Sequence, residues 1–269
     1  MGTRLQGKVA FITGIGSSGP GWSTGKAIAT TFASEGARVF GVNRSSESAR
    51  ETLELIHREG GSCELFTADV SRAEDVEAAV RACREAFGRI DILVNNVGCA
   101  SYGGVVEQSE DDWDRVFATN LKSVYHTCRN CIPVMLAGGG GAIVNISSIV
   151  ALRWTGHPLV SYASSKAALH QLTRQIAMQY ARQNIRANTV IPGMLETPMV
   201  VEPIRRQFGD RWQEILDQRH RLCPGGHMGD AHDAAWAAVY LASDEAKFVN
   251  GTELLVDGGM SCQIGAPTF

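Results

Sequence analysis

One stretch near the N-terminus decides the fold: Val9-Ala-Phe-Ile-Thr13-Gly14-Ile-Gly16-Ser-Ser-Gly19-Pro-Gly21-Trp-Ser-Thr-Gly25-Lys-Ala-Ile-Ala29. It passes from an apolar run of strand length, through a glycine-rich turn, into a run whose apolar residues recur at helical spacing. Such a turn lets backbone N–H groups approach a pyrophosphate, and the following helix N-terminus adds a favourable dipole. Glycine-rich turns are common, but the place of this one, directly after the first predicted strand, favours a nucleotide site.

The rest of the chain repeats this alternation of strand-like and helical runs, with no proline- or serine-rich linker between them. Strands separated by helices predict right-handed crossovers and a parallel sheet with helices on both faces. We therefore expect one α/β domain over residues 1–269, doubly wound around a seven-stranded parallel sheet. The predicted strands are Val9–Thr13, Arg38–Val42, Cys63–Thr67, Ile90–Val94, Gly141–Ile146, Arg186–Val190 and Glu253–Val256.

Residues 199–228 interrupt this alternation, because they include prolines and the pair Gly225-Gly226 but no strand-like run. Ligands of doubly wound folds bind beyond the carboxyl ends of the strands. The segment is therefore predicted to be an insertion above the sheet that serves as a substrate lid.

Composition excludes several classes of function. The 269 residues carry a formal net charge of -3, which gives no basic field for nucleic acid or an anionic membrane. No apolar run reaches the roughly 18 residues that a membrane span requires, and the first residues lack a signal-peptide core. The expectation is a cytoplasmic protein with no nucleic-acid or membrane partner.

Seven cysteines are scattered along the chain, and only Cys128 and Cys131 have the C-x-x-C spacing. They lie late in a predicted helix without a second pair of ligands, which argues against a zinc or redox site. The sequence predicts no metal centre and reduced thiols, as in the cytosol.

A tyrosine and a lysine four residues apart, Tyr162 and Lys166, open a long helical run. This spacing places the phenol and the ammonium on one helix face, one turn apart. An unperturbed tyrosine has a pKa of about 10, and a nearby cation is expected to favour the phenolate and bring it into acid/base range. The same spacing also fits two residues on a solvated helix face, so the interpretation depends on the other motifs.

The second predicted strand is followed by Asn43-Arg44-Ser45. Sites for NAD usually place a carboxylate here to hold the ribose hydroxyls, whereas a guanidinium suits a 2′-phosphate. Asn43 and Arg44 therefore predict NADP(H) in preference to NAD(H). Arg44 as a solvated charge at the strand end, with NAD(H) as the cofactor, is the alternative.

Three more polar positions stand out. Asp69 follows the third predicted strand and is either a helix N-terminal residue or a partner for adenine. The run Asn95-Asn96-Val97-Gly98 ends the fourth strand, where Gly98 lets the chain pass close to a bound ring. Asn120 lies inside a helical run, where asparagine is a mediocre helix former and an inward amide usually has a buried partner.

Taken together, these motifs resemble the short-chain dehydrogenase/reductase family, including its 3-oxoacyl-carrier reductases and alcohol dehydrogenases. The resemblance spans essentially the whole chain, and its specificity comes from the order and spacing of many individually weak motifs. It rests on the Thr13–Gly25 loop, Asp69, Asn95-Asn-Val-Gly98, Asn120, Ser148, Tyr162-x-x-x-Lys166, Pro192-Gly193 and Val256-Asp-Gly-Gly259.

The resemblance implies a Rossmann domain that transfers a hydride between a nicotinamide cofactor and an alcohol or ketone. Tyr162 would be the general acid or base, Ser148 would hydrogen-bond the substrate oxygen, and Lys166 would bind the nicotinamide ribose and favour ionisation of Tyr162. Asn120 would hold a water that links Lys166 to solvent. Cofactor contacts would come from Gly14, Gly19, Gly21, Gly25, Asn43, Arg44, Asp69, Val70, Asn96, Val97, Gly98, Tyr162, Lys166, Pro192, Gly193 and Thr197.

The glycine-rich loop departs from the family pattern, because the thirteen residues Thr13–Gly25 exceed its usual length and Ser23 stands where a middle glycine is expected. Gly14 and Gly25 keep their expected places, and Gly19 or Gly21 is expected to restore the missing flexibility.

The predicted partner is a small-molecule alcohol or ketone whose identity the sequence leaves open. Residues expected around it are Cys99, Ser101, Tyr102, Arg153, Trp154, His157, Met194 and the segment 199–222. The family resemblance implies a homotetramer, with a homodimer as the alternative. A nucleotide-sensing protein that kept the fold without turnover is the alternative from another functional class, although such a sensor would not need Ser148, Tyr162, Lys166 and Asn120.

Overall fold

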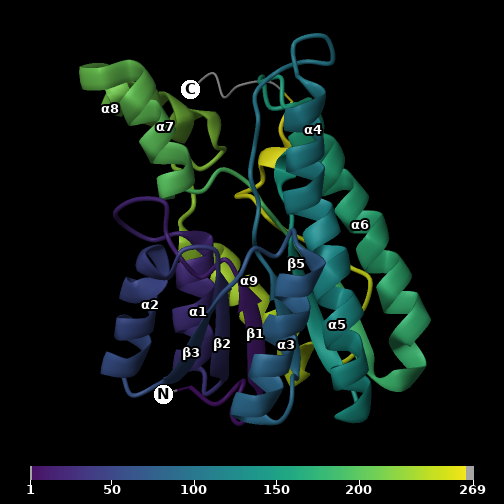
Figure 1. Ribbon diagram of the computed structural model, residues 1–269. Coiled ribbons are helices and arrows are strands. Elements are labelled where there is room, and N and C mark those ends of the chain that lie inside the picture. Colours follow the sequence, from purple (N-terminus) through teal and green to yellow (C-terminus); the bar gives the residue numbers. More distant parts are fainter. Residues whose placement is uncertain (1, 265–269) are drawn as a thin grey trace.

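The computed structural model describes residues 2–264 and forms one sheet covered by helices (Figure 1). The strands are β1 (Val9–Thr13), β2 (Arg38–Asn43), β3 (Ser62–Thr67), β4 (Ile92–Asn95), β5 (Gly141–Ile146), β6 (Ile185–Pro192) and β7 (Glu253–Val256). The α-helices are α1 (Thr24–Ser34), α2 (Ser46–Arg58), α3 (Ala73–Phe87), α4 (Glu110–Phe117), α5 (Ser123–Ala137), α6 (Val160–Tyr180), α7 (Pro198–Phe208), α8 (Trp212–Leu222) and α9 (Ala231–Ala242).

All seven strands are parallel and lie in the order β3-β2-β1-β4-β5-β6-β7. The order grows outward from β1 in one direction as far as β3 and then restarts on the other side of β1 with β4. Ligand crevices of open α/β sheets form where the strand order reverses, at the carboxyl ends of the strands. The doubly wound parallel sheet predicted from the sequence is confirmed, and its crevice lies between β1 and β4.

Alternate residues of each central strand face opposite sides of the sheet and build two separate cores. Ala10 and Ile12 of β1 face the core formed with α1, α2 and α9. Val9 and Phe11 face the core formed with α3, α5 and α6. Both faces are buried, which explains why these strands are nearly continuous apolar runs.

The segment that follows β6 leaves the sheet. Helices α7 and α8 stand beyond the carboxyl ends of the strands (Figure 1). They enclose a small apolar cluster of their own, formed by Ile204, Leu216, Cys223 and Met228. As predicted, residues 199–228 contribute no strand to the sheet.

The bounds of β1, β5 and β7 are the predicted ones, and those of β2 and β3 differ by one residue. The largest differences are at β4, which was expected over Ile90–Val94 and runs over Ile92–Asn95, and at β6, which was expected over Arg186–Val190 and runs over Ile185–Pro192. Asp91 directly precedes β4, and its carboxylate accepts the Val9 N–H at 2.9 Å and pairs with Arg89. Within residues 2–264, no helix is long and apolar enough to span a bilayer.

Candidate active site

The turn after β1 forms a cradle at the crevice. Gly14 has a φ of +73°, a conformation that residues with a Cβ adopt only under strain. A Cβ on Gly25 would lie 1.8 Å from the Gly14 carbonyl oxygen, so the close approach of α1 to the turn requires glycine. The Asn96 amide donates to the same carbonyl at 2.9 Å. Backbone atoms of the turn and of α1 therefore lie close together here. A backbone turn at a helix N-terminus suits a phosphate group.

The extra residues of the glycine-rich loop reach towards the segment above the sheet. Gly19 lies against α7, where a Cβ would be 2.8 Å from Glu202 Cγ. The Trp22 ring contacts His232 of α9 edge-on, with 4.6 Å between the ring centroids. Ser23 is the N-cap of α1, and its hydroxyl accepts the Lys26 N–H. The residue that stands in place of a middle glycine therefore satisfies the first turn of the helix.

Asn43 and Arg44, at the end of β2, have different surroundings. The Asn43 side chain accepts the Gly16 N–H at 3.1 Å and donates to the Ser45 carbonyl and the Ser48 hydroxyl. Asn43 thus shapes the glycine-rich loop, a use that its position in the sequence did not reveal. Arg44 is exposed at the rim of the crevice.

Asp69 lies in the turn that precedes α3. It does not cap that helix, because the N-cap residue is Arg72. Its carboxylate accepts both the backbone N–H and the hydroxyl of Ser71. Burial opposes ionisation of Asp69, but the Ser71 hydrogen bonds, aided by the charges of Arg44 and Arg72, lower its pKa overall. The helix N-terminal interpretation of Asp69 was therefore wrong. Val70 is buried in the core beside α3.

Ser148, Tyr162 and Lys166 converge at the carboxyl end of β5. Ser148 follows that strand, and its side chain hydrogen-bonds Tyr162, which lies in the first turn of α6. Lys166 is 3 % exposed, donates to the Ile146 carbonyl at 2.9 Å, and lies 5.9 Å from the centroid of the Tyr162 ring. A Cβ on Gly98 would lie 3.2 Å from Lys166 Nζ, so the segment after β4 also borders this cluster.

Burial governs the ionisation of both groups. It raises the pKa of Tyr162, against the opposing effect of the Ser148 hydrogen bond. Burial also lowers the pKa of Lys166 to about 8. The expectation that Lys166 brings the pKa of Tyr162 down is not met in this structure, because desolvation of the phenolate outweighs the other influences. Perturbation of two neighbouring titratable groups by desolvation is typical of functional sites.

Asn120 lies in a π-helical turn, Ala118–Lys122, between α4 and α5. Its amide accepts the Cys99 N–H and donates to the Cys99 carbonyl and to the Ser165 hydroxyl, which in turn donates to the Tyr162 carbonyl. The buried partner expected for Asn120 is thus the backbone of Cys99. Single π turns inside helices are frequent at functional sites. Ser165 was not predicted from the sequence, although its place between Tyr162 and Lys166 was a usable signal.

The remaining predicted contacts with the nicotinamide lie after β6. Gly193 is close to the backbone of Asp257, where a Cβ would lie 2.7 Å from the Asp257 Cα. Thr197 is buried and is the N-cap residue of α7. Pro192 and Thr197 therefore flank the passage from the sheet to α7. Val97 contacts Gly14 on the other side of the crevice.

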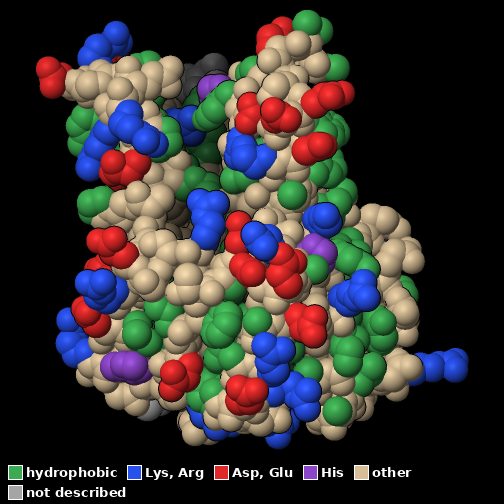
Figure 2. All heavy atoms as spheres, in the orientation of Figure 1, with side chains coloured by type: hydrophobic (Ala, Val, Ile, Leu, Met, Phe, Trp, Pro, Cys, Tyr) green, Lys and Arg blue, Asp and Glu red, His purple; other side chains and the backbone are tan. Residues whose placement is uncertain are grey.

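Residues predicted to surround a substrate occupy the loops after β4 and β5. Figure 2 shows the surface hollowed between the α7–α8 segment and the α4 side of the molecule. A largely apolar cavity of about 480 Å³ lies between the two loops and is lined by Val105, Trp154, His157 and Ala163, among others. Of the predicted set, Arg153, Trp154 and His157 line this cavity, and Tyr102 contacts the His157 ring edge-on.

Several groups of the predicted substrate set have partners within the protein. The Cys99 thiol contacts the Arg115 guanidinium, and the Ser101 carbonyl accepts from Gln108. Arg153 also lines the cavity, but its guanidinium donates to the carbonyls of Leu152 and Ser261. Met194 packs against the apolar cluster of α7 and α8.

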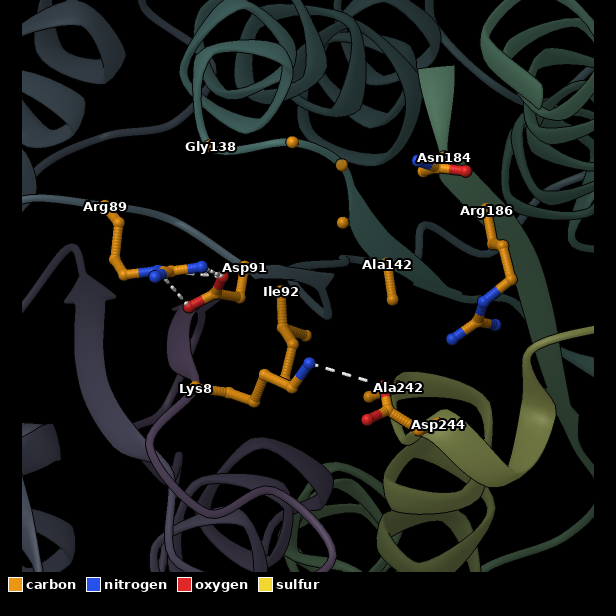
Figure 3. Close-up of a pocket in the computed structure, with 13 residues that line it drawn as sticks. Lys8, Arg89, Asp91, Ile92, Gly138, Ala142, Asn184, Arg186, Ala242 and Asp244 are labelled. Atoms are coloured by element: carbon orange, nitrogen blue, oxygen red, sulfur yellow. Dashed lines mark hydrogen bonds and ion pairs between the residues drawn. The ribbon is translucent and has the colours of Figure 1, made fainter. Parts of the chain in front are cut away.

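A second cavity, of about 290 Å³, opens at the opposite, amino edge of the sheet (Figure 3). Its charged side chains satisfy one another. Arg89 pairs with Asp91, and Lys8 with Asp244. Arg186 donates to the carbonyls of Leu241 and Ser243 at the end of α9. The cavity offers no cluster of three metal-ligating side chains, and none is found among residues 2–264.

The two cysteines with C-x-x-C spacing are both buried in α5. Burial raises the pKa of Cys128 to about 12 and that of Cys131 above its usual range. A thiol with a raised pKa is a poor nucleophile and a poor metal ligand at neutral pH.

Comparison with known proteins agrees with this architecture. The family model described as enoyl-(acyl carrier protein) reductase matches residues 19–261. A crystal structure of a Burkholderia xenovorans protein described as a short-chain dehydrogenase/reductase is 48% identical, with a TM-score of 0.95, and the match covers 98% of this chain and 100% of that one.

Two curated relatives have named activities. The 3beta-hydroxysteroid dehydrogenase 1 of Eggerthella lenta is 39% identical over 97% of this chain and 96% of its own length. The 2,5-dichloro-2,5-cyclohexadiene-1,4-diol dehydrogenase LinX of Sphingobium indicum is 35% identical over 97% of this chain and 99% of its own length. With this coverage, the chain belongs to the short-chain dehydrogenase/reductase family, and it is an NAD(P)-dependent oxidoreductase that acts on alcohol or ketone groups.

Proposed function

We propose that this enzyme transfers a hydride between NADP(H) and a secondary alcohol or ketone, with Tyr162 as the general acid and base. The observation that carries the proposal is the cluster of the half-buried Tyr162 and Ser148 side chains with the buried Lys166 at the carboxyl edge of the sheet. Tyr162 and Lys166 have perturbed pKa values, and among residues 2–264 no carboxylate is found in an ion pair with Lys166. Groups with perturbed pKa values and no ion-pair partner are more typical of a catalytic site than of a stabilising interaction.

A dinucleotide fits the crevice because Gly14 and Gly25 carry no side chains of their own and the turn leads into the N-terminus of α1. The residues after β4, namely Asn96, Val97 and Gly98, would form the opposite wall, and Pro192, Gly193 and Thr197 would flank the reactive ring. When bound, the nicotinamide cofactor supplies or accepts the hydride. Lys166 is placed to donate to its ribose hydroxyls.

Residues of the protein then transfer the proton. In ketone reduction, Tyr162 gives its phenolic proton to the substrate oxygen as negative charge develops there, and Ser148 donates a second hydrogen bond to that oxygen. In alcohol oxidation, the phenolate takes the hydroxyl proton. The ammonium of Lys166 stabilises the phenolate, and Asn120 holds the path by which Lys166 exchanges its proton with solvent.

Support for NADP(H) in preference to NAD(H) comes from the end of β2. Asn43 leaves no carboxylate to repel a 2′-phosphate, and Arg44 is exposed at the rim of the crevice. Arg44 also lies close enough to Asp69 to help lower its pKa, so its charge acts on the side of the crevice where the adenosine would lie. A guanidinium matches phosphate geometry.

The proposed substrate carries its hydroxyl or keto group on a ring. Two curated relatives are named for a steroid and for a cyclohexadienediol. In this chain, the largely apolar cavity beside Ala163, the neighbour of Tyr162, presents Trp154 and His157 to an incoming ring. Residues 199–228 would close over such a substrate as a lid.

The remaining elements of the proposal concern assembly and compartment. Exposed apolar side chains on α5, α6 and β7, including Tyr125, Met178 and Leu255, support a homotetramer. Buried, unpaired cysteines fit the cytoplasm. Sedimentation of the purified protein tests the first of these points, because a monomer would contradict it.

The direct test mixes the protein with NADPH and a panel of cyclic and linear ketones, and with NADP⁺ and the matching alcohols. The absorbance of the reduced nicotinamide reports turnover. We expect turnover, with cyclic substrates preferred. Tight cofactor binding without turnover across the panel would instead favour a nucleotide sensor.

A further inference from the structure

A buried serine, histidine and glutamate lie in line directly behind the proposed catalytic cluster. The Ser147 hydroxyl is 2.7 Å from His170 Nε2, and His170 Nδ1 is 3.5 Å from Glu253 Oε1. Ser147 and His170 are both about 5 % exposed. Neither touches the proposed path of the substrate, and the proposed mechanism gives them no role.

These three residues join separate parts of the fold. Ser147 directly follows β5 and precedes Ser148, whereas His170 lies one turn beyond Lys166 on α6. The Ser147 hydroxyl is also 3.3 Å from the Lys166 carbonyl oxygen. Glu253 belongs to the edge strand β7 and is also held by the Arg174 guanidinium. The line therefore ties the loop of Ser148 to the helix of Tyr162 and Lys166.

The Ser147 hydroxyl has one proton and two acceptors. When His170 is neutral with its proton on Nδ1, facing Glu253, its Nε2 accepts the Ser147 proton. When His170 is charged, Nε2 becomes a donor, so the Ser147 proton must turn to the Lys166 carbonyl. The charge state of His170 therefore changes which part of the cluster Ser147 holds.

The charges that face His170 come from two elements. Glu253 of β7 favours the charged imidazole, whereas Arg174 and Lys166 of α6 oppose it. Burial is the largest influence and lowers the pKa of His170, so the imidazole is neutral at pH 7. Protonation on acidification places a second positive charge one helical turn from Lys166.

We propose that Ser147, His170 and Glu253 form a positioning relay that sets Ser148 and Lys166 relative to Tyr162. His170 is a positioning residue and not a catalytic one, because it acts through Ser147 and contacts neither substrate nor cofactor. Its protonation disturbs the relay and lowers the rate of ketone reduction in acid. This inference rests on the proposed function of Tyr162.

The test compares His170→Leu, which removes the relay, with His170→Gln, which can keep a hydrogen bond to Ser147 but cannot titrate. His126→Gln is the matched control, because His126 is a second buried histidine, on α5, whose pKa burial also lowers. Ketone reduction is the informative direction, since protonated Tyr162 remains competent in acid. Its kcat is measured from pH 5 to pH 8 on the full-length protein.

We expect His170→Leu to lose about 10- to 100-fold in kcat with little change in the KM for cofactor, as a misplaced catalytic group would. His170→Gln should recover most of this activity and flatten the fall of kcat in acid. The His126→Gln control should show the same fall of kcat in acid as the wild type. If His170→Leu keeps its kcat and only melts at a lower temperature, the relay merely supports the fold and the proposal is wrong.

A second readout does not depend on turnover. The phenolate absorbance of Tyr162, taken as the difference between wild type and Tyr162→Phe, reports the pKa of the phenol, which the Ser148 hydrogen bond lowers. His170→Leu should shift this titration, and His126→Gln should not. If the protein lacks turnover but the shift appears, the proposed reaction fails while the relay stands; an unchanged titration overturns the relay itself.

Discussion

The charged side chains at the two edges of the sheet have different kinds of partner. At the amino edge, the cavity of Figure 3 pairs Arg89 with Asp91 and Lys8 with Asp244, and Arg186 is satisfied by backbone carbonyls. At the carboxyl edge, Lys166 is buried beside Tyr162 and donates to a carbonyl. Both edges contain glycine-rich turns and buried polar groups.

The difference separates structure from chemistry. Paired charges mainly hold strand ends together. An unpaired buried ammonium costs stability, and in return its pKa moves to about 8, near the pH at which proton transfer is needed. Matched substitutions at the two edges test this contrast.

The largest contrast is expected between two lysines. Lys166→Met should lower kcat about 10²- to 10⁴-fold, because the phenolate of Tyr162 loses its cation. Lys8→Met, at the amino edge, should leave kcat unchanged. Steady-state kinetics with saturating cofactor measures both, and equal losses would erase the distinction between the edges.

Two glycines sharpen the comparison next. Gly25→Ala places a methyl group on the Gly14 carbonyl and should weaken cofactor binding about 100-fold or more, a loss of roughly 3 kcal/mol. Gly139→Ala meets open space at a φ of +92°, so it should cost about 1–2 kcal/mol of stability without changing affinity. Fluorescence titration with NADPH separates the two, after circular dichroism has shown that both variants fold.

The lysine pair also predicts opposite effects on stability. The pKa of Lys166 falls from 10.5 to about 8 on folding, so the unfolded state binds more protons between these values and wild-type stability rises with pH across that window. Below pH 8 the penalty is fully present. Lys166→Met should therefore be more stable at pH 7, by up to about 3 kcal/mol less the lost hydrogen bond to Ile146, with the gain shrinking towards pH 10.

Urea unfolding at pH 7 and pH 10 measures this gain. Lys8→Met should change stability by less than about 1 kcal/mol at either pH, as exposed ion pairs do. A Lys166→Met variant that is less stable at both pH values would show that this lysine is not held under strain.

The smallest expected effect is on cofactor preference, and it compares two arginines at opposite ends of α2. Arg44 precedes α2 at the carboxyl edge, and Arg58 ends the same helix at the amino edge. Arg44→Ser should lower the ratio of kcat/KM for NADPH to that for NADH about 10-fold, one lost charge-assisted contact. Arg58→Ser should leave the ratio unchanged, and a wild type that prefers NADH would overturn the role of Arg44.

Much of the fold was predictable because parallel strands buried on both faces are continuous apolar runs. The start of β4 was not, since the apolar Ile90 continues the strand-like run although the strand begins only at Ile92. Ser148, Tyr162 and Lys166 were identified from motif order, and the sheet brings them together because parallel strands end at one edge.

Other features had no signal in the sequence. The raised pKa of Tyr162 depends on burial, which spacing does not report. The hydrogen bond that Asn43 accepts from Gly16 joins residues 27 apart along the chain, so the sequence did not indicate it. His170 has the spacing of an ordinary core residue on α6, and only its contact with Ser147 reveals the relay.

The central claim is that a phenol at the carboxyl edge moves the proton during hydride transfer. Replacing Tyr162 with Phe and measuring both ketone reduction and NADPH affinity tests it most directly. The account predicts that kcat falls about 10³-fold or more while the dissociation constant for NADPH changes less than about threefold. Wild-type turnover in Tyr162→Phe would contradict it.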